Sequence, residues 1–110
     1  MKAEVYQKLA HEFADYSGVR EGKWTYPVMG LAEEAGEVAG KFAKAIRDDG
    51  EIITPERKEA VIKELGDVLW MVAEIATQLD VSLAYIMASN IEKLESRKRR
   101  NVIHGEGDNR

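Results

Sequence analysis

The sequence predicts an all-α protein with the architecture of a four-helix bundle. Apolar residues recur every three or four positions in four separate segments, which is the pattern of helices that bury one face. Only two prolines occur among the 110 residues, so long helices are expected between a few breaks. With 45% apolar residues, the chain is long enough for one core, and we expect a single domain over residues 1–110.

The first two helices are expected on either side of a loop that contains glycines. The first begins at Ala3 and ends near Tyr16, and the second begins near Pro27 or Val28. Asp48-Asp49-Gly50 ends the second helix, because glycine is common just beyond a helix end. The expected apolar faces are Tyr6, Leu9, Ala10 and Phe13 in the first helix, and Leu31, Ala35, Val38, Phe42 and Ile46 in the second.

The third and fourth helices have recognisable start signals. Thr54 suits the N-cap, where its hydroxyl accepts a hydrogen bond from a free amide, and Pro55 suits the first helical position. Ser82 is the expected N-cap of the fourth helix, and residues from about 100 to 110 lack periodicity and are expected to form a loop. The apolar stripes are Val61, Leu65, Val68, Val72, Ile75 or Ala76, and Leu79 in the third helix, and Leu83, Ile86, Met87, Ile91 and Leu94 in the fourth.

Part of the third helix is apolar on every side. Residues 68–73 read Val-Leu-Trp-Met-Val-Ala, and a helix of this kind must be covered all round. Three neighbouring helices are few for this task, so we expect a homodimer or homotetramer that completes the bundle, with Trp70 near the interface. The alternative is a monomer in which Trp70 is partly exposed.

The composition restricts the chemistry. The chain has no cysteine, and His11 and His104 lie far apart, so any metal must be held mainly by oxygen. The N-terminus has no apolar leader, and no run approaches the roughly 18 apolar residues of a membrane span. We therefore expect a cytoplasmic protein without a membrane partner. A net charge of −4 argues against broad nucleic-acid binding, although residues 97–100 form a basic run.

Two short acidic phrases are the most informative motif: Glu33-Glu34-Ala35-Gly36-Glu37 and Glu64-Leu65-Gly66-Asp67. Like charges three or four positions apart destabilise an isolated helix by roughly 0.2–0.5 kcal/mol per pair, and each internal glycine costs about 1 kcal/mol relative to alanine. On a helical wheel, the first acid of each pair lies about 60° from the apolar stripe and the second about 120°, on the same side. If the two helices pack antiparallel, the pairs converge at one edge of their interface.

Four converging carboxylates suit a hard divalent cation. Mg²⁺ prefers oxygen ligands and is often completed by substrate phosphates, and the Glu-x-x-His pairs of di-iron bundles are missing. The alternative is that both phrases are ordinary solvated helix faces, as most acidic stretches are. Their shared spacing, internal glycine and angular offset favour the metal site.

Taken together, Glu33-Glu34-x-x-Glu37, a gap of 26 residues and Glu64-x-x-Asp67 resemble the signature of the all-α nucleoside triphosphate pyrophosphohydrolases, specifically the small MazG-like members. The Gly-x-Gly-Asp-Asn-Arg ending is similar to theirs as well. The resemblance implies a MazG-type fold and cleavage of a nucleoside or deoxynucleoside triphosphate between the α- and β-phosphates, in the service of nucleotide-pool house-cleaning. It implies Mg²⁺, with Mn²⁺ as a substitute, bound by Glu34, Glu37, Glu64 and Asp67. Glu33 and Glu34 are its catalytic candidates, Glu33 positioning a further metal or the attacking water.

Basic, amide and aromatic side chains are candidates for binding the rest of the triphosphate. Lys41 and Lys44 lie on the acidic side of the second helix. Lys93 and Arg97 are one turn apart in the fourth helix. Asn90 falls within an apolar stripe, where a buried amide needs partners, and Trp24, or less favourably Tyr26, offers a ring for the base. The alternative for the lysines is an ordinary solvated surface, and for Asn90 it is a hydrogen-bonded amide in the core. The alternative for Trp24 and Tyr26 is that they anchor the loop. The substrate-binding candidates are Trp24, Lys41, Lys44, Asn90, Lys93 and Arg97.

Two other functions compete with the enzyme. A helical nucleic-acid-binding or regulatory module would use the basic run at residues 97–100 against phosphates, but it leaves the acidic phrases unexplained. A purely structural oligomerising bundle predicts that Glu64→Gln changes nothing.

Overall fold

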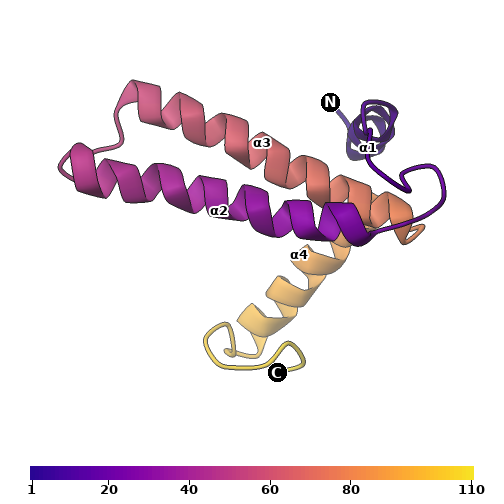
Figure 1. Cartoon of the computed structure of the whole chain (residues 1–110). Coiled ribbons are helices and arrows are strands. Elements are labelled where there is room, and N and C mark those ends of the chain that lie inside the picture. Colours follow the sequence, from indigo (N-terminus) through magenta and orange to yellow (C-terminus); the bar gives the residue numbers. More distant parts are fainter.

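The computed structural model describes residues 1–110 and contains four helices and no strand. The helices are α1 (Ala3–Glu12), α2 (Thr25–Asp48), α3 (Pro55–Gln78) and α4 (Leu83–Arg99). The long helices α2 and α3 lie side by side and antiparallel, α1 packs against α3, and α4 leaves the far end of α3 (Figure 1). The predicted all-α fold and the antiparallel pairing are confirmed.

The predicted helix starts agree with the structure. The Thr54 hydroxyl accepts a hydrogen bond from the Arg57 amide at 3.1 Å, and the Ser82 hydroxyl accepts one from the Tyr85 amide at 3.0 Å. Each cap satisfies an amide that has no partner within the helix. Helix α2 begins at Thr25, slightly earlier than predicted, and ends at Asp48 as expected.

Helix α1 ends four residues short of the predicted boundary. The Arg20 guanidinium reaches back to the carbonyl oxygens of His11 and Ala14, at 3.1 and 3.2 Å, and so satisfies groups that a longer helix would have used. Gly18 then turns the loop with a φ of +84°, a conformation that favours glycine. Phe13, predicted in the apolar face of α1, is therefore 75% exposed at the end of the helix.

Small residues allow α2 and α3 to approach closely. Gly30 and Ala45 of α2 are buried, as are Val61 and Met71 of α3. A Cβ atom built on Gly30 would lie only 2.6 Å from the Met71 sulfur, so any larger residue would displace the Met71 side chain. Of the predicted stripes, Val61 is buried in this contact, whereas several other residues remain exposed: Ala35, Phe42, Ile46, Leu65 and Leu79.

A network of polar groups around the buried Glu74 ties α1 and the following loop to α3. The Glu74 carboxylate is fully buried, 3.1 Å from His11 Nδ1, and accepts a hydrogen bond from the Tyr16 hydroxyl at 2.9 Å. Gln78 donates to the Tyr16 hydroxyl and to the Val19 carbonyl, both at 2.8 Å. A buried charge persists where it is paired and hydrogen-bonded, and this network fixes the path of the loop.

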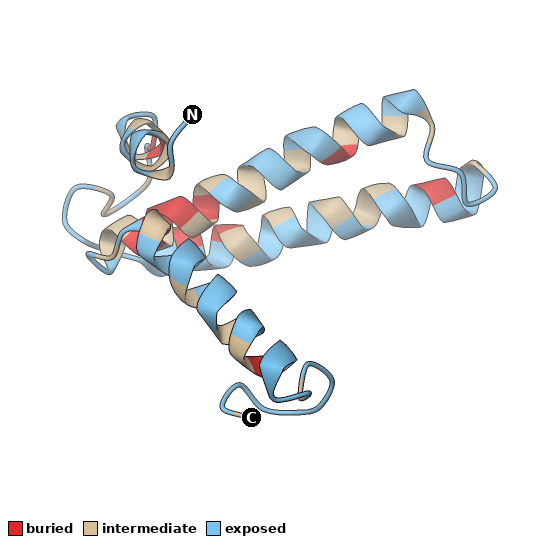
Figure 2. Ribbon diagram, turned by 180° about the vertical axis from the view of Figure 1, so that it is seen from behind, coloured by how far each residue is buried: buried red, intermediate tan, exposed pale blue.

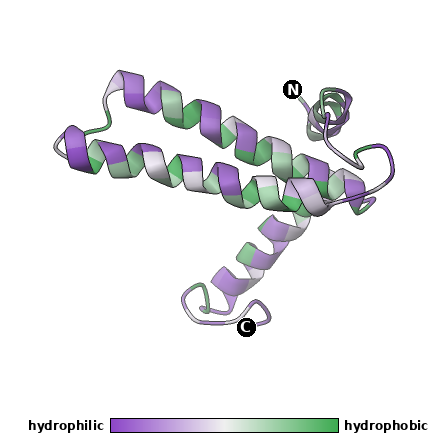
Figure 3. Ribbon diagram, in the orientation of Figure 1, coloured by the Kyte–Doolittle hydropathy of each residue, from purple (hydrophilic) through white to green (hydrophobic).

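Helix α4 projects from the rest of the chain. It leaves α3 at an angle of 105°, and Leu83 at its start packs in the small core with Ala10 and Ala73. Beyond this point its apolar side is uncovered (Figures 2 and 3). Asn90, predicted within a buried stripe, is therefore exposed. No single helix is long and apolar enough to cross a membrane; α3 and α4 meet the length and composition criteria only as a bent pair.

Candidate metal centre

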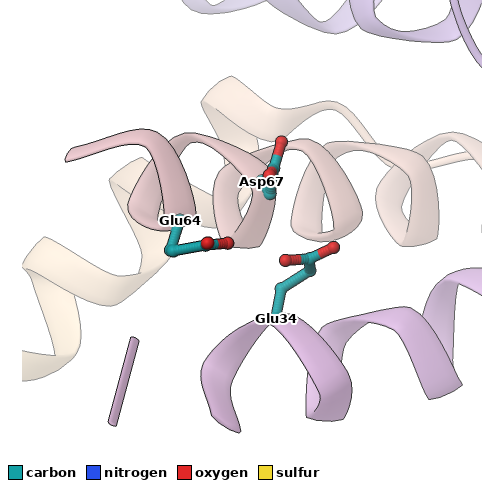
Figure 4. Close-up of side chains that lie close together, drawn as sticks. All are labelled: Glu34, Glu64 and Asp67. Atoms are coloured by element: carbon teal, nitrogen blue, oxygen red, sulfur yellow. The ribbon is translucent and has the colours of Figure 1, made fainter. Parts of the chain in front are cut away.

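Antiparallel packing of α2 and α3 brings acidic side chains of the two phrases together. Glu34 of α2 faces Glu64 and Asp67 of α3 (Figure 4), and one carboxylate oxygen from each lies within 4.8 Å of the others. All three side chains are half-buried. We call Glu34, Glu64 and Asp67 the acidic cluster.

The acidic cluster is electrostatically unfavourable without a cation. Burial raises the pKa of Glu34 above its ordinary value, and the negative charge of Asp67 and a hydrogen bond to Glu64 raise this pKa further. The Lys41 ammonium, 3.6 Å from Glu64 Oε1, compensates part of the charge. A single lysine beside three carboxylates leaves the cluster suited to further positive charge.

The donor set fits a hard divalent cation. All three donors are carboxylates, the ligands that Mg²⁺ takes, and oxygens on opposite sides of one Mg²⁺ are about 4.2 Å apart, because each lies roughly 2.1 Å from the ion. The three carboxylate oxygens lie within 4.8 Å of one another, which is compatible with their sharing one ion. Partial exposure leaves room for water or substrate oxygens to complete the shell.

The other two acidic residues of the first phrase lie outside the cluster. Glu37 is exposed and is about 60° farther round α2 from the apolar stripe than Glu34, so its carboxylate does not join the group. Glu33 is exposed as well, and together with Glu34 it borders a cavity of about 110 Å³. The structure therefore brings three of the four expected metal ligands together and places Glu33 beside them.

The candidate phosphate-binding residues occupy two separate places. Lys41 lies at the acidic cluster through its contact with Glu64, whereas Lys44 is exposed on α2. Asn90, Lys93 and Arg97 belong to α4, whose C-terminal end lies well away from the α2–α3 pair (Figure 1). Within one chain, Lys41 is therefore the only one of these candidates that lies beside the acidic cluster.

Lys93 and Arg97 hold the C-terminal tail instead. Asp108 Oδ1 lies 2.9 Å from Lys93 Nζ and 3.0 Å from Arg97 Nη2, and the same guanidinium nitrogen donates to the Asp108 carbonyl at 2.6 Å. These cations hold the pKa of Asp108 below its ordinary value. Arg97 is buried and its Nε has no hydrogen-bond partner, so this side chain retains an unused donor.

Of the two aromatic residues that the sequence singled out for base binding, Tyr26 borders the same cavity as Glu34, whereas Trp24 is not among the residues that line it. Trp24 is 53% exposed in the loop before α2, while Tyr26 stacks on Tyr16 with ring centroids 5.3 Å apart. Trp70 borders two hollows beside the acidic residues, and its indole donates to the Ala10 carbonyl at 2.9 Å. The sequence feature that points to Trp70 is its position three residues after Asp67, which places both side chains on the same side of α3.

Comparison with known proteins supports the importance of this region. The family model of the MazG nucleotide pyrophosphohydrolase domain matches residues 27–102, which include the whole acidic cluster. The chain is 46% identical to the Gene 37 protein of Mycobacterium phage L5 over the full length of both chains. It is also 34% identical to the uncharacterized protein YvdC of Bacillus subtilis (strain 168), covering 83% of this chain and 91% of that one. No solved structure matches the chain.

Proposed function

Because the chain belongs to the MazG nucleotide pyrophosphohydrolase family, we propose that it hydrolyses a nucleoside or deoxynucleoside triphosphate between the α- and β-phosphates. The products are the nucleoside monophosphate and pyrophosphate. The observation that carries this proposal is the convergence of Glu34, Glu64 and Asp67 from two helices. Carboxylates alone repel a triphosphate, so the arrangement serves this reaction only with a bridging cation.

Mg²⁺ is the proposed cofactor, with Mn²⁺ as a substitute, and Glu34, Glu64 and Asp67 would hold it. When bound, it neutralises phosphate charge and lowers the pKa of a coordinated water. Glu37 lies one turn along α2 from Glu34 and is exposed, so its side chain is free to rotate towards a triphosphate bound at the acidic cluster. Lys41, already 3.6 Å from Glu64, is the chain's own cation for a phosphate oxygen.

Glu33 is the proposed proton acceptor. It lies outside the acidic cluster but next to Glu34 and on the border of the same cavity, so its carboxylate is not committed to the metal. During hydrolysis the water oxygen forms a bond to phosphorus, the bridging P–O bond breaks, and the water proton passes to Glu33. The nucleotide pool of the cytoplasm is the proposed setting, with removal of unwanted triphosphates as the role.

A homo-oligomer is the proposed working form, because one chain leaves too much apolar surface open. The chain exposes 8059 Å², whereas a compact monomer of 12.4 kDa exposes about 6100 Å². Its radius of gyration is 16.7 Å, against about 13 Å for a compact chain of this length. The excess area is comparable to the roughly 1,000–2,500 Å² that each chain buries in an obligate dimer.

The uncovered apolar faces of α2, α3 and α4 are the proposed contact surfaces of a homodimer or homotetramer. Trp70, expected near the interface, is half-buried and held by its bond to Ala10 within the chain. The larger uncovered residues lie farther out: Phe42 and Ile46 on α2, Leu65 and Leu69 on α3, and Ile86, Ile91 and Leu94 on α4.

Measurement of pyrophosphate release tests the proposed reaction. A screen of the common ribo- and deoxyribonucleoside triphosphates, dUTP and oxidised triphosphates should give pyrophosphate with Mg²⁺ or Mn²⁺ and none in EDTA. Glu64→Gln should abolish release with the helices intact by circular dichroism, and Glu95→Gln, on the exposed side of α4, should be a neutral control. Release of orthophosphate alone, or full activity in EDTA, would contradict the proposal.

The structure does not favour the competing nucleic-acid-binding module. Arg97, in the basic run, is buried against the tail, and Arg100 donates to the Arg110 carbonyl at 2.8 Å. Two of the four cations are thus engaged within the chain. Steeply salt-dependent binding of DNA or RNA, without metal-dependent pyrophosphate release, is the result that would favour this alternative.

A further inference from the structure

A small enclosed cavity of about 110 Å³ adjoins the acidic cluster. It lies between the loop after α1 and the facing sides of α2 and α3. Glu33 and Glu34 contribute carboxylates from α2, Asp15 contributes one from the loop, and Tyr26 and Trp70 contribute aromatic rings. Because Glu34 belongs to both the acidic cluster and the cavity lining, a ligand with phosphates at the cluster has its other end within reach of the cavity.

The aromatic walls of this cavity are held in place by interactions behind them. The Trp70 indole is fixed by its hydrogen bond to the Ala10 carbonyl, at 2.9 Å. Tyr26 stacks on Tyr16, and the Tyr16 hydroxyl is fixed by the fully buried Glu74. Walls that are ordered before a ligand arrives reduce the entropic cost of binding, and aromatic rings suit a flat heterocycle.

Asp15 gives the cavity a chemical preference. It is not part of the acidic cluster, so no metal competes for its carboxylate. An ionised carboxylate accepts hydrogen bonds and cannot donate one, so it attracts an exocyclic amine of a base and repels a carbonyl oxygen at the same position. Resting on the proposed function, we propose that this cavity receives the nucleobase of the triphosphate and that Asp15 selects bases carrying an exocyclic amine.

The other hollow beside Trp70 has a different chemistry. It is open, has a volume of about 420 Å³ and is lined mainly by apolar side chains that include Tyr6 and Phe13. Its carboxylate, Asp67, belongs to the acidic cluster. A base in this hollow would be held by stacking alone and would show little preference between amine and carbonyl. The two locations therefore predict different substrate profiles.

Competition between dCTP and dUTP tests the proposal, since these substrates share sugar and phosphates and differ along one edge of the base, where cytosine has an amine beside an acceptor nitrogen and uracil has a carbonyl beside an N–H. We expect the wild-type kcat/KM for pyrophosphate release to favour dCTP by at least about tenfold, and Asp15→Asn to bring the ratio close to one, because an amide both donates and accepts. Glu21→Gln, an exposed acid in the same loop, should retain the wild-type ratio. The ratio is taken within each variant, so partial loss of folded protein cancels. A wild-type ratio near one, or an unchanged ratio in Asp15→Asn, overturns the proposal.

A binding measurement separates this proposal from the proposed hydrolysis. Deoxycytidine and deoxyuridine carry no phosphates, so their binding requires neither metal nor turnover. Deoxycytidine should shift the Trp70 indole N–H resonance, assigned by its retention in Trp24→Phe, at lower concentration than deoxyuridine, and Asp15→Asn should remove this difference. If these shifts occur but no triphosphate releases pyrophosphate, the base site stands and the hydrolysis fails. If pyrophosphate is released but neither nucleoside shifts Trp70, the base-site proposal fails alone.

Discussion

Gly30 on α2 and Met71 on α3 form the closest approach of the two long helices beside the acidic cluster. A Cβ atom at position 30 would lie 2.6 Å from the Met71 sulfur and 3.3 Å from its Cγ. Met71 is buried and borders the cavity of about 110 Å³, so a Cβ atom at position 30 would force its side chain out of the present packing and into that space. The spacing that brings Glu34 opposite Asp67 therefore depends on the absence of one methyl group.

Gly30→Ala is expected to destabilise the protein despite the better helix propensity of alanine. Overpacking a tight contact costs about 1–3 kcal/mol, which exceeds the roughly 1 kcal/mol gained by replacing a helical glycine. Gly36→Ala is the matched control, because nothing lies within 4 Å of its added Cβ, and it should stabilise the chain. Urea unfolding followed by circular dichroism measures both changes, and equal stabilisation by the two variants would contradict the close-contact argument.

Asp67→Asn is expected to separate stability from metal binding. Removing this charge relieves repulsion at Glu34, whose pKa is raised by burial and by Asp67, so the metal-free variant should melt at a higher temperature than wild type. Saturating Mg²⁺ should raise the wild-type melting temperature, since a ligand at 100 times its Kd adds about 2.7 kcal/mol. It should raise that of the variant much less. Thermal melts with Mg²⁺ and with EDTA measure both effects, and an equal Mg²⁺ response of the two proteins would exclude Asp67 as a ligand.

The parts of this arrangement that could be predicted from the sequence are those fixed within one helix. The spacing of Glu64 and Asp67 sets their relative angle, and Thr54 caps its own helix, so periodicity and local chemistry sufficed. The convergence of Glu34 with Glu64 and Asp67 was predicted as well, because both acidic pairs share one offset from their stripes and a short connection favours antiparallel packing. Other interactions between segments escaped prediction. Glu74 follows an apolar run as a single charge, but its partner His11 lies 63 positions earlier, and no local pattern connects them.

Phe13 and Asn90, which the sequence places on apolar faces, are exposed for a similar reason: their surroundings depend on segments outside the local pattern. Phe13 and Asn90 were assigned from helical wheels that assume a covered face. Phe13 is exposed because α1 ends before it, and Asn90 is exposed because α4 leaves the bundle at 105°. A helical wheel gives the angle of a residue, not the extent of the helix or the presence of a neighbour.

Glu74→Ala is expected to destabilise the fold strongly. The carboxylate is fully buried and joins His11 and Tyr16, so its removal leaves two polar groups without their partner and creates a cavity, at a cost of about 3–5 kcal/mol. Glu12→Ala, an exposed acid at the end of α1, should change stability by less than about 0.5 kcal/mol. Chemical denaturation compares the two, and a similar small effect for both would contradict the role of the buried network.

The tail contact is expected to be released by acid. Hydrogen bonds from Lys93 and Arg97 hold the pKa of Asp108 below its ordinary value of 3.8. A carboxylate with a lowered folded-state pKa contributes stability above its unfolded pKa, and this contribution is lost as the pH falls through the folded value. Tail amide resonances should therefore stay constant at neutral pH and move towards unfolded positions below about pH 4. Asp108→Asn should shift the tail amide resonances part of the way towards unfolded positions already at pH 7, because Arg97 keeps its bond to the backbone carbonyl of residue 108, and unchanged resonances would refute the charge-based contact.

Ile91→Glu is expected to disrupt the proposed assembly. Ile91 is 55% exposed on the uncovered apolar side of α4, where a charge is harmless in a monomer but must be desolvated against a second chain. The dissociation constant of the oligomer should rise about a hundredfold, which corresponds to about 2.7 kcal/mol, while the helix content stays unchanged. Glu92→Ala, an exposed acid about 100° from Ile91 on the polar side of α4, should assemble as the wild type does. Sedimentation velocity over a concentration series decides the matter: a wild-type protein that remains monomeric at high concentration, or an Ile91→Glu variant that assembles normally, would show that a second copy does not cover this face.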